Sequence, residues 1–485
     1  MFSIDKGLSP FWENRRNVYV AVFLVSLSLS LVSIAFSPVL NRDGMLYVHV
    51  ADLLLSGNFD EALKQFDWPF FSILIAAVSK VSFVPSIYVA YGIAALAAAG
   101  VTVTLASLLY RVAPKSGIFL SAFVVLAFPA LNEYRDLVIR DWPAWFFMVL
   151  AVWLVLARKE KPGLLSGGLV FLCIVAATLF RLEMLFVYIP LFLFYLSAQD
   201  QRKNILPLAI FPVVAGMAFL AGIYFFIDGA AERLEKYAGI IDVTEIVKKV
   251  DYFGGVIGSQ VLHEISKDYG IWVLVTGLFS IVVVTLMGHL GVLFLVPALS
   301  RSGVSKSARM DCVDKRLYAS LVLFWGAVLI AFLFARFFIS SRYAVPLSLS
   351  LLPFLYVCVG DFIRQNRRGL VAALAFLFVI HGLSNLIATK GYEKKVIMDS
   401  GRWVAEKLPE DKVHINDGRI SFYAERGYVQ DDDVEDGPSK DDIWQVLLAD
   451  KERETALVEG AKGNYEFIRR FDSGGDATVL VFKKR

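Results

Sequence analysis

The 485-residue sequence is poor in charge and in cysteine. Only 19% of its residues are charged, against about 25% in an average soluble domain, so an ordinary soluble protein is not expected. The three cysteines, Cys173, Cys312 and Cys358, are scattered in or beside apolar runs, which excludes a disulfide framework and the cysteine spacing of a zinc site. The formal net charge is only +3, so no nucleic-acid partner is expected.

Apolar residues are what the sequence has in excess. They make up 57% of the chain, and the excess falls in runs of roughly 16–28 residues, the length of transmembrane helices. The N-terminus lacks the small-residue cleavage site of a signal peptide, so the first run is expected to remain as a span. The composition therefore predicts a polytopic α-helical membrane protein.

The apolar runs predict about eleven transmembrane helices. In hydrocarbon the backbone N–H and C=O groups can form hydrogen bonds only with each other, and a helix satisfies them all within one segment. The expected spans lie at about 18–37, 86–110, 116–131, 142–157, 163–180, 182–198, 205–227, 270–298, 317–338, 343–360 and 369–387.

Lysine and arginine in the short loops predict the orientation of these spans. The basic clusters are Arg15 and Arg16; Arg111 and Lys115; Arg158, Lys159 and Lys161; Arg202 and Lys203; Arg301 to Arg316; and Arg364, Arg367 and Arg368. All six are cytoplasmic only if the apolar stretch 69–82, which is short for a span, lies at the interface. Residues 38–85 then form one outward loop with at least two membrane-surface helices, the N-terminus lies inside and the C-terminus outside.

Two further outward segments have distinct patterns. Residues 228–269 alternate charged and apolar residues and predict an amphipathic surface helix or two, forming a lid. Residues 388–485 predict a small soluble α/β domain beyond the transmembrane domain of residues 1–387. Within it we expect strand, turn and helix over 408–429, a helix over 441–452, and strands at 455–460 and 477–482.

Ionisable residues at the outward membrane surface are the candidates for chemistry, because their placement there is costly. They are Arg42, Asp43, Asp67, Glu133, Arg135, Asp136, Arg140, Asp141, Arg181, Glu183, Arg336 and Arg342. Asp43 follows an outward span end and Asp141 precedes an inward one. Paired carboxylates can deprotonate or orient an acceptor hydroxyl or amine, and arginines can bind a phosphate or diphosphate.

The acids also have structural interpretations. Asp43 could be the N-cap of the helix expected over 44–55, and Asp67 could cap the interfacial helix or touch substrate. Arg140 and Asp141 could form an interfacial ion pair that caps the next helix. His49 is expected to be a packed or surface histidine.

The arginines of the later loops have structural interpretations of the same kind. Arg181 and Glu183 could form a structural pair at a helix break. Arg336 and Arg342 could extend to lipid head groups.

Five stretches in order carry a family resemblance: NRDGMLYVHVADLLLSGN, DWPFFSILIAAVSK, FPALNEYRDLVIRDWPAWFF, ATLFRLEMLFVYIP and SRYAVPLSLSLLP. Together, over roughly residues 18–390, they resemble the C-type glycosyltransferase (GT-C) superfamily of integral membrane enzymes. Within it, the sequence is most similar to the branch that holds protein O-mannosyltransferases and the aminoarabinose transferase that modifies lipid A.

The resemblance implies roles for individual residues. Asp43 matches the first-loop acid held to be the catalytic base, and Asp141, with Arg140 beside it, matches the second-loop acid. Arg181 stands where relatives carry a basic residue near the donor phosphate. Arg342, with Tyr343, matches the late Arg-Tyr-x-x-Pro motif and is also expected to bind that phosphate.

The remaining substrate-binding candidates are Arg42, Asp67, Glu183 and Tyr343. The sequence departs from the family at the Pro-Pro-Leu helix, where only Pro69 remains, and carries Arg-x-Glu in place of a common Lys-Gly-Pro. It has no dense cluster of acids or histidines, so no metal or other cofactor is expected.

The expected function is transfer of a sugar from a polyprenyl-phosphate donor to a lipid, glycan or protein acceptor, with inversion and with Asp43 as the base. The expected place is the periplasmic face of a bacterial inner membrane, with membrane lipid as a partner. Two alternatives remain: a flippase or transporter of a lipid-linked sugar, and a polymerase or ligase of surface polysaccharide. Against the first, no span shows the paired glycine or proline interruptions of a midplane site.

Overall fold

The computed structural model describes residues 14–157, 164–197, 217, 243–299, 310–387, 394–408, 412–429, 442–461, 463–472, 474 and 477–485. Several expected features lie outside these residues. They are the span at 205–227 apart from residue 217, the first part of the loop 228–269, and the basic residues at 158–161, 202–203 and 301–309.

The chain divides into two compact units. We call Met1–Ser26, Ala99–Tyr134 and Ala144–Asn385 the bundle unit, and Leu27–Ala98, Arg135–Pro143 and Leu386–Arg485 the loop-and-tail unit. Four helices, α2 (Arg15–Phe36), α6 (Ser86–Val112), α9 (Asp141–Ala157) and α19 (Arg368–Ile387), contribute residues to both units.

The chain is a multi-pass membrane protein. Six helical segments in the described residues are long and apolar enough to cross a membrane, and four apolar helices are shorter. The helices of the bundle unit besides α2, α6 and α9 are α10 (Leu164–Phe180), α11 (Tyr188–Ser197), α15 (Gly270–Leu290), α17 (Cys312–Arg336), α18 (Val345–Gln365) and α19 (Arg368–Ile387). They follow the expected spans in order, while the count of eleven stays a prediction.

Two of the expected spans are broken into shorter helices. The stretch at 116–131 becomes η1 (Pro114–Ser116), α7 (Ile118–Leu126) and α8 (Pro129–Asn132), because Pro129 has no N–H to continue the first helix. The stretch at 270–298 becomes α15, η6 (Gly291–Leu295) and α16 (Val296–Leu299). Here Gly291 adopts φ +54° directly after α15, a conformation that favours glycine.

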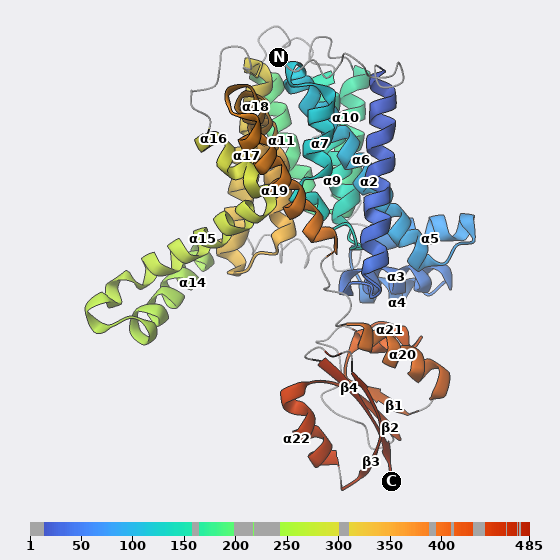
Figure 1. Cartoon of the computed structure of the whole chain (residues 1–485). Coiled ribbons are helices and arrows are strands. Elements are labelled where there is room, and N and C mark those ends of the chain that lie inside the picture. The colour runs from blue at the N-terminus through green and yellow to red at the C-terminus, as the bar shows by residue number, and fades with distance from the viewer. Residues whose placement is uncertain are drawn as a thin grey trace. The chain divides into compact units, whose positions relative to one another are not determined.

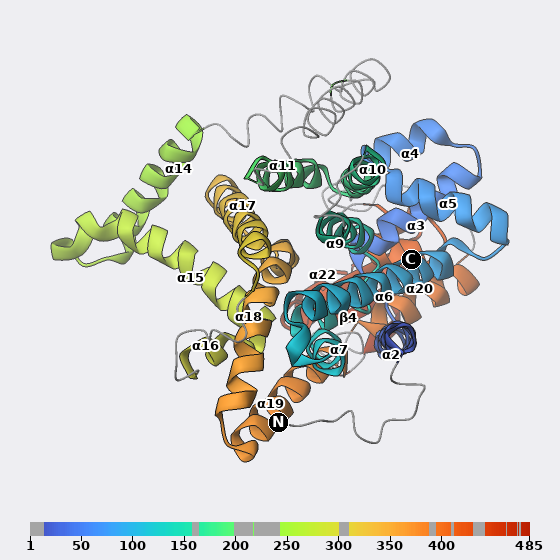
Figure 2. The same cartoon turned by 90° about the horizontal axis from the view of Figure 1, so that it is seen from above.

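Helix α18 is the core of the bundle unit. The apolar window of Ser341–Gln365 is 78% buried, against 28% for Glu264–Leu299 and 17% for Arg368–Leu386. Seen from above, α7 and α10 are viewed nearly end-on, whereas α17, α18 and α19 are inclined (Figure 2). A helical turn, η8 (Ser341–Ala344), leads directly into α18. The side chains of η8 are therefore positioned by a largely buried helix.

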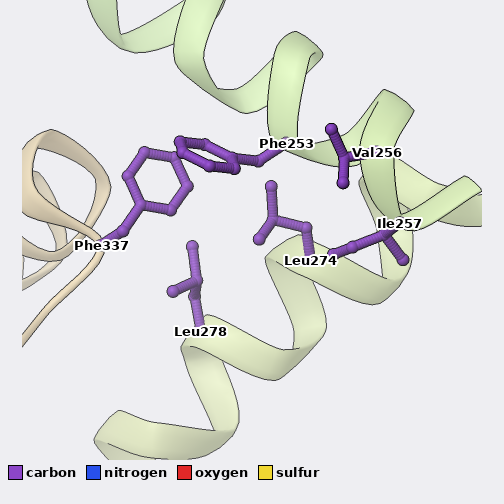
Figure 3. A pocket seen from close by; sticks show the side chains of 6 residues that line it. All are labelled: Phe253, Val256, Ile257, Leu274, Leu278 and Phe337. Atoms are coloured by element: carbon purple, nitrogen blue, oxygen red, sulfur yellow. The ribbon is translucent and has the colours of Figure 1, made fainter. Parts of the chain in front are cut away.

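A helical hairpin forms the described part of the expected lid. Helix α14 (Val243–Val256) returns through η4 (Ile257–Val261) and η5 (Glu264–Tyr269) into α15, and the hairpin projects from the other helices of the bundle unit (Figure 1). A pocket of 290 Å³ lies at its base, between these elements and the residue after α17 (Figure 3). Its lining is entirely apolar: Phe253, Val256, Ile257, Leu274, Leu278 and Phe337.

The loop of residues 38–85, which we call the first outward loop after its expected orientation, contains three helices, where at least two were expected. They are α3 (Arg42–Leu55), α4 (Phe59–Gln65) and α5 (Phe70–Ser82). Helix α5 runs across the direction of α2 (Figure 1), and its 13 residues are too few to span hydrocarbon. The centre of the Tyr47 ring lies 5.5 Å from that of Phe66 and 5.3 Å from that of Phe71, and these contacts join the three helices.

The C-terminal part of the chain is a small α/β domain, which we call the tail domain. Its sheet has the strand order β1-β2-β4-β3, with β1 (Val413–Ile415) parallel to β2 (Trp444–Asp450) and the other pairs antiparallel. The last two strands are β3 (Tyr465–Asp472) and β4 (Ala477–Lys484). Helices α20 (Lys395–Lys407) and α21 (Gly418–Tyr423) share one core with the sheet, and α22 (Lys451–Ala461) packs on a second.

Three predictions for the tail domain were wrong or incomplete. The expected helix over 441–452 is strand β2, and the expected strand at 455–460 lies inside helix α22. A short apolar run does not reveal its period, so β2 depends on pairing with β4, in which Val446 lies opposite Val481. The Glu- and Ala-containing α22 follows its helix propensity. Strand β3, largely exposed, was not predicted.

Candidate functional site

The first acid stands at the beginning of a helix. Asn41 is the N-cap of α3 and Asp43 lies in its first turn, so Asp43 is not itself the cap. The unpaired N–H groups and the dipole of a helix N-terminus favour a carboxylate there. Arg42 is exposed and Asp43 is half-buried.

Asn41 connects this helix to the segment between α8 and α9, which we call the second outward loop after its expected orientation. Its side-chain Nδ2 donates to the carbonyl of Val138 at 3.1 Å, and its Oδ1 accepts from the Val138 N–H at 2.9 Å. The amide of Asn41 therefore pairs with both backbone groups of Val138. This pairing fixes the position at which α3 begins. We call this pair the Asn41 clamp.

The clamp brings the two acid-bearing segments together. Asp43 is two residues after Asn41, and Asp141 is three residues after Val138. Asp141 lies in the first turn of α9 and is 1% exposed. The structure thus unites the loops of the two predicted acids, a contact that the sequence did not reveal. We call Asp43, Asp141 and the clamp the acid cluster.

The basic residues of the second loop hold it in place. Arg135 is 1% exposed and donates to Ser30 Oγ at 3.1 Å, and burial lowers the pKa of Arg135 to about 9, which leaves it charged at neutral pH. Arg140 lies over the ring of Phe66 at 5.2 Å. Phe66 is the residue before Asp67, and the side chain of Asp67 is exposed.

The predicted phosphate-binding residues gather in the bundle unit. Arg181, just before η2 (Leu182–Val187), forms an ion pair with Glu183 and lies 4.7 Å from the centre of the Tyr343 ring. Arg342 lies 5.7 Å from the same ring. Tyr343 thus stacks with two guanidinium groups, which helps to hold like charges near each other. We call these four residues the cation cluster.

A buried polar network adjoins the cation cluster through η8. Ser341, the neighbour of Arg342, donates to Glu133 at 3.1 Å and accepts from Tyr134 at 2.6 Å. His289 lies behind Tyr134, with Nε2 3.3 Å from the tyrosine oxygen. Sequence analysis singled out Glu133 but missed His289. Its signal was an ionisable side chain inside the apolar run 270–298.

The tail domain contacts the first outward loop inside the loop-and-tail unit. The N–H of Leu40 donates to the hydroxyl of Tyr423 at 2.8 Å. Gly427 adopts φ +85°, and a Cβ there would lie 2.9 Å from Cε1 of His49, so glycine is required on both counts. His49 is therefore a packed residue on α3, as expected.

Metal ligands do not gather among the described residues. No group of three or more histidine, cysteine or acidic side chains there could hold an ion.

Comparisons with known proteins give a likeness among solved structures. No protein-family model and no curated protein matches the chain. Among solved structures, the chain is similar to ArnT from Cupriavidus metallidurans, a crystal structure in the apo state. The identity is 14% and the TM-score 0.47, over 96% of this chain and 98% of that chain. At this TM-score, the function of the chain has to be argued from its own residues.

Proposed function

We propose that the protein is a glycosyltransferase that moves a sugar from a polyprenyl-phosphate donor to a lipid, glycan or protein acceptor. The reaction takes place at the periplasmic face of a bacterial inner membrane. The observation that carries this proposal is the Asn41 clamp, which joins the segments of two acids, Asp43 and Asp141, that are distant in sequence.

The acid cluster supplies the base. Asp43 takes the proton from the acceptor hydroxyl or amine as that group attacks the anomeric carbon, and the nearby Asp141 orients the acceptor. Asp43 suits the first role because it is half-buried rather than sealed and therefore reaches substrate. Asp141 is 1% exposed, so it acts on the acceptor through Asp43 and its loop rather than by direct contact.

The cation cluster receives the leaving phosphate. The bond between the anomeric carbon and the phosphate oxygen breaks, and its electron pair stays on the phosphate. Arg181 and Arg342 stabilise the charge that develops there, and guanidinium groups suit phosphate oxygens geometrically. Displacement in a single step inverts the anomeric carbon.

The apolar pocket at the base of the hairpin matches the lipid part of such a donor in polarity. Its six lining side chains include no polar group, so it offers contacts to a hydrocarbon chain and no chemistry of its own. Phe337, on its edge, precedes Arg342 by five positions.

The test uses purified protein in lipid vesicles, labelled synthetic polyprenyl-phosphate glycosides and a membrane extract as the source of acceptor. Wild type transfers label to an acceptor and Asp43→Asn does not. Asp60→Asn, which changes an exposed acid at the start of α4 in the same loop, serves as the matched control and stays active.

Each other outcome contradicts part of the proposal. Equal transfer by wild type and Asp43→Asn would remove Asp43 from the chemistry. Movement of labelled donor across the vesicle bilayer, with no transfer to any acceptor, would establish a flippase instead.

A further inference from the structure

The tail domain reaches the loop that carries Asp43 through one hydroxyl group. The backbone N–H of Leu40 donates to the hydroxyl oxygen of Tyr423 at 2.8 Å. Leu40 is 2% exposed, so water has little access to replace the tyrosine as acceptor. Tyr423 is the last residue of α21 and packs against the core that α20 and α21 share with the sheet. Because a buried N–H without a partner is costly, this bond holds the chain in place just before it enters α3.

Leu40 in turn lies against the first turn of α3. Gly44 directly follows Asp43, and a Cβ at Gly44 would lie 2.7 Å from Cδ1 of Leu40 and 2.9 Å from Oδ1 of Asn41. These distances leave no room for a side chain at position 44. The side chains of Leu40 and Asn41 therefore contact the helix backbone at the residue next to Asp43.

A second contact of the tail domain lies further along the same helix. Gly427 follows α21, and a Cβ there would lie 2.9 Å from Cε1 of His49. His49 is six residues after Asp43, which is less than two turns of a helix. The tail domain thus contacts the chain just before α3 and again on α3 itself, on either side of Asp43 in the sequence.

The contact with Tyr423 complements the Asn41 clamp. The clamp joins Asn41 to the second outward loop, and Tyr423 joins the preceding residue, Leu40, to the tail domain. A helix held at one residue can still rotate about that contact. Hydrogen bonds from two consecutive residues to two different parts of the loop-and-tail unit restrict this rotation, and with it the direction in which the first turn of α3 presents its side chains.

We propose that Tyr423 is a positioning residue for Asp43, and that the tail domain serves to fix the proposed base in front of the acceptor. This inference rests on the proposed function. A general base must lie within hydrogen-bond reach of the proton that it takes, and a displacement of about 1 Å can lower a rate by about 100-fold. Tyr423 itself takes no part in the chemistry, because it acts through Leu40 and the first turn of α3.

The first test removes the hydroxyl group and keeps the ring. In the transfer assay described above, Tyr423→Phe should lower kcat by about 10-fold, less than a full displacement would, because the Asn41 clamp remains. KM for the donor should be unchanged, since the cation cluster belongs to the bundle unit. The matched control is Tyr465→Phe, which changes a tyrosine of β3 that packs on the other core of the tail domain, and it should keep the wild-type kcat. An unchanged kcat in Tyr423→Phe would overturn the proposal.

The second test separates positioning from a merely structural role. In the Asp43→Asn variant there is no base left to position, so adding Tyr423→Phe should leave the residual rate unchanged. A general loss of folded enzyme would instead lower the rate by the same factor in both backgrounds. A further fall of about 10-fold in the double variant would therefore overturn the role of Tyr423 in positioning Asp43.

The third test needs no substrate. The N–H of Met45 donates to the carbonyl of Asn41 at 3.0 Å as α3 begins, and hydrogen exchange reports how firmly such a bond is held. In Tyr423→Phe, the amides of Leu40 and Met45 should exchange about 10-fold faster, with no change in strands β2 and β4. Equal exchange at Leu40 and Met45, or faster exchange throughout the tail domain, would overturn the proposal and leave wild-type transfer intact. A wild type that transfers no sugar would overturn the proposed function and the role of Asp43 with it.

Discussion

The acid cluster and the cation cluster are held in place by different physical means. Asn41 fixes the acid cluster with two directional hydrogen bonds to the backbone of one residue, Val138. The cation cluster is held by stacking on the Tyr343 ring and by the Arg181–Glu183 ion pair. Hydrogen bonds to backbone tolerate little displacement, which suits a base that must meet one proton. Stacked guanidinium planes can slide over a ring, which suits a phosphate that moves as its bond breaks.

The largest effect is expected from the acids themselves. Asp43→Asn and Asp141→Asn should each lower kcat by about 10²- to 10⁴-fold, the range for loss of a general acid or base, with KM for the donor unchanged. Steady-state kinetics with varied donor concentration measures both constants. A rise in donor KM in Asp43→Asn would mean that the two clusters do not divide the work as proposed.

The next largest effect is expected from the arginines. Arg181→Lys and Arg342→Lys keep the charge but lose the planar face that stacks on Tyr343, so KM for the donor should rise by about 10-fold. Tyr343→Phe keeps the ring and should resemble wild type, whereas Tyr343→Leu should not. If Arg181→Lys and Tyr343→Leu act through one stack, their effects in the double variant will be less than additive.

The clamp should affect stability more modestly. Asn41→Ala removes both hydrogen bonds to Val138 and leaves the N–H and C=O of this buried residue without their partner, so it should lower the free energy of unfolding by about 1–3 kcal/mol. Asn41→Asp retains the acceptor for the Val138 N–H and should lie between Asn41→Ala and wild type. Thermal unfolding in detergent gives the ranking. An unchanged melting temperature for Asn41→Ala would show that the clamp does not hold the loops.

The smallest effect is expected at the contact of the tail domain with α3. Burial lowers the pKa of His49, although the nearby Asp52 and Glu61 act in the opposite direction. A lowered pKa in the folded state means that the unfolded chain binds more protons, so stability is full above the ordinary histidine pKa and declines as pH falls below it.

This dependence can be measured with one variant. The difference in melting temperature between pH 7.5 and pH 5.5 should be smaller in His49→Gln than in wild type. An equal difference would exclude His49 as the source. The contact is confined to one histidine packed against Gly427, so only a small shift is expected.

The sequence predicted the helices of the membrane part well and the tail domain poorly. A long apolar run that crosses a membrane has to be helical, so hydropathy alone predicts α2, α6 and α17. A run such as Trp444–Asp450 is compatible with a helix or a strand until its partner is known. That partner, β4, lies beyond a helix and another strand, and no local signal in the sequence identifies it.

Some residues of the candidate site could likewise be predicted from the sequence, whereas the contacts between them could not. Asp43, Asp141 and the arginines were found because a charge at a membrane surface is conspicuous. The clamp was not, because it depends on one amide meeting a backbone residue 97 positions away. His289 was missed although it is an ionisable side chain in an apolar run, because its hydrogen-bonding neighbour Tyr134 lies 155 positions away in the sequence.

The hydrogen bond from Leu40 to Tyr423 has a consequence for biosynthesis. Its partners are 383 positions apart, so the first outward loop leaves the ribosome long before the domain that completes it. Domains emerge and fold from the N-terminus. The contact between Leu40, just before the helix that carries Asp43, and Tyr423 therefore forms only after the tail domain has been made. A chain that stops before Tyr423 would insert its spans without that contact.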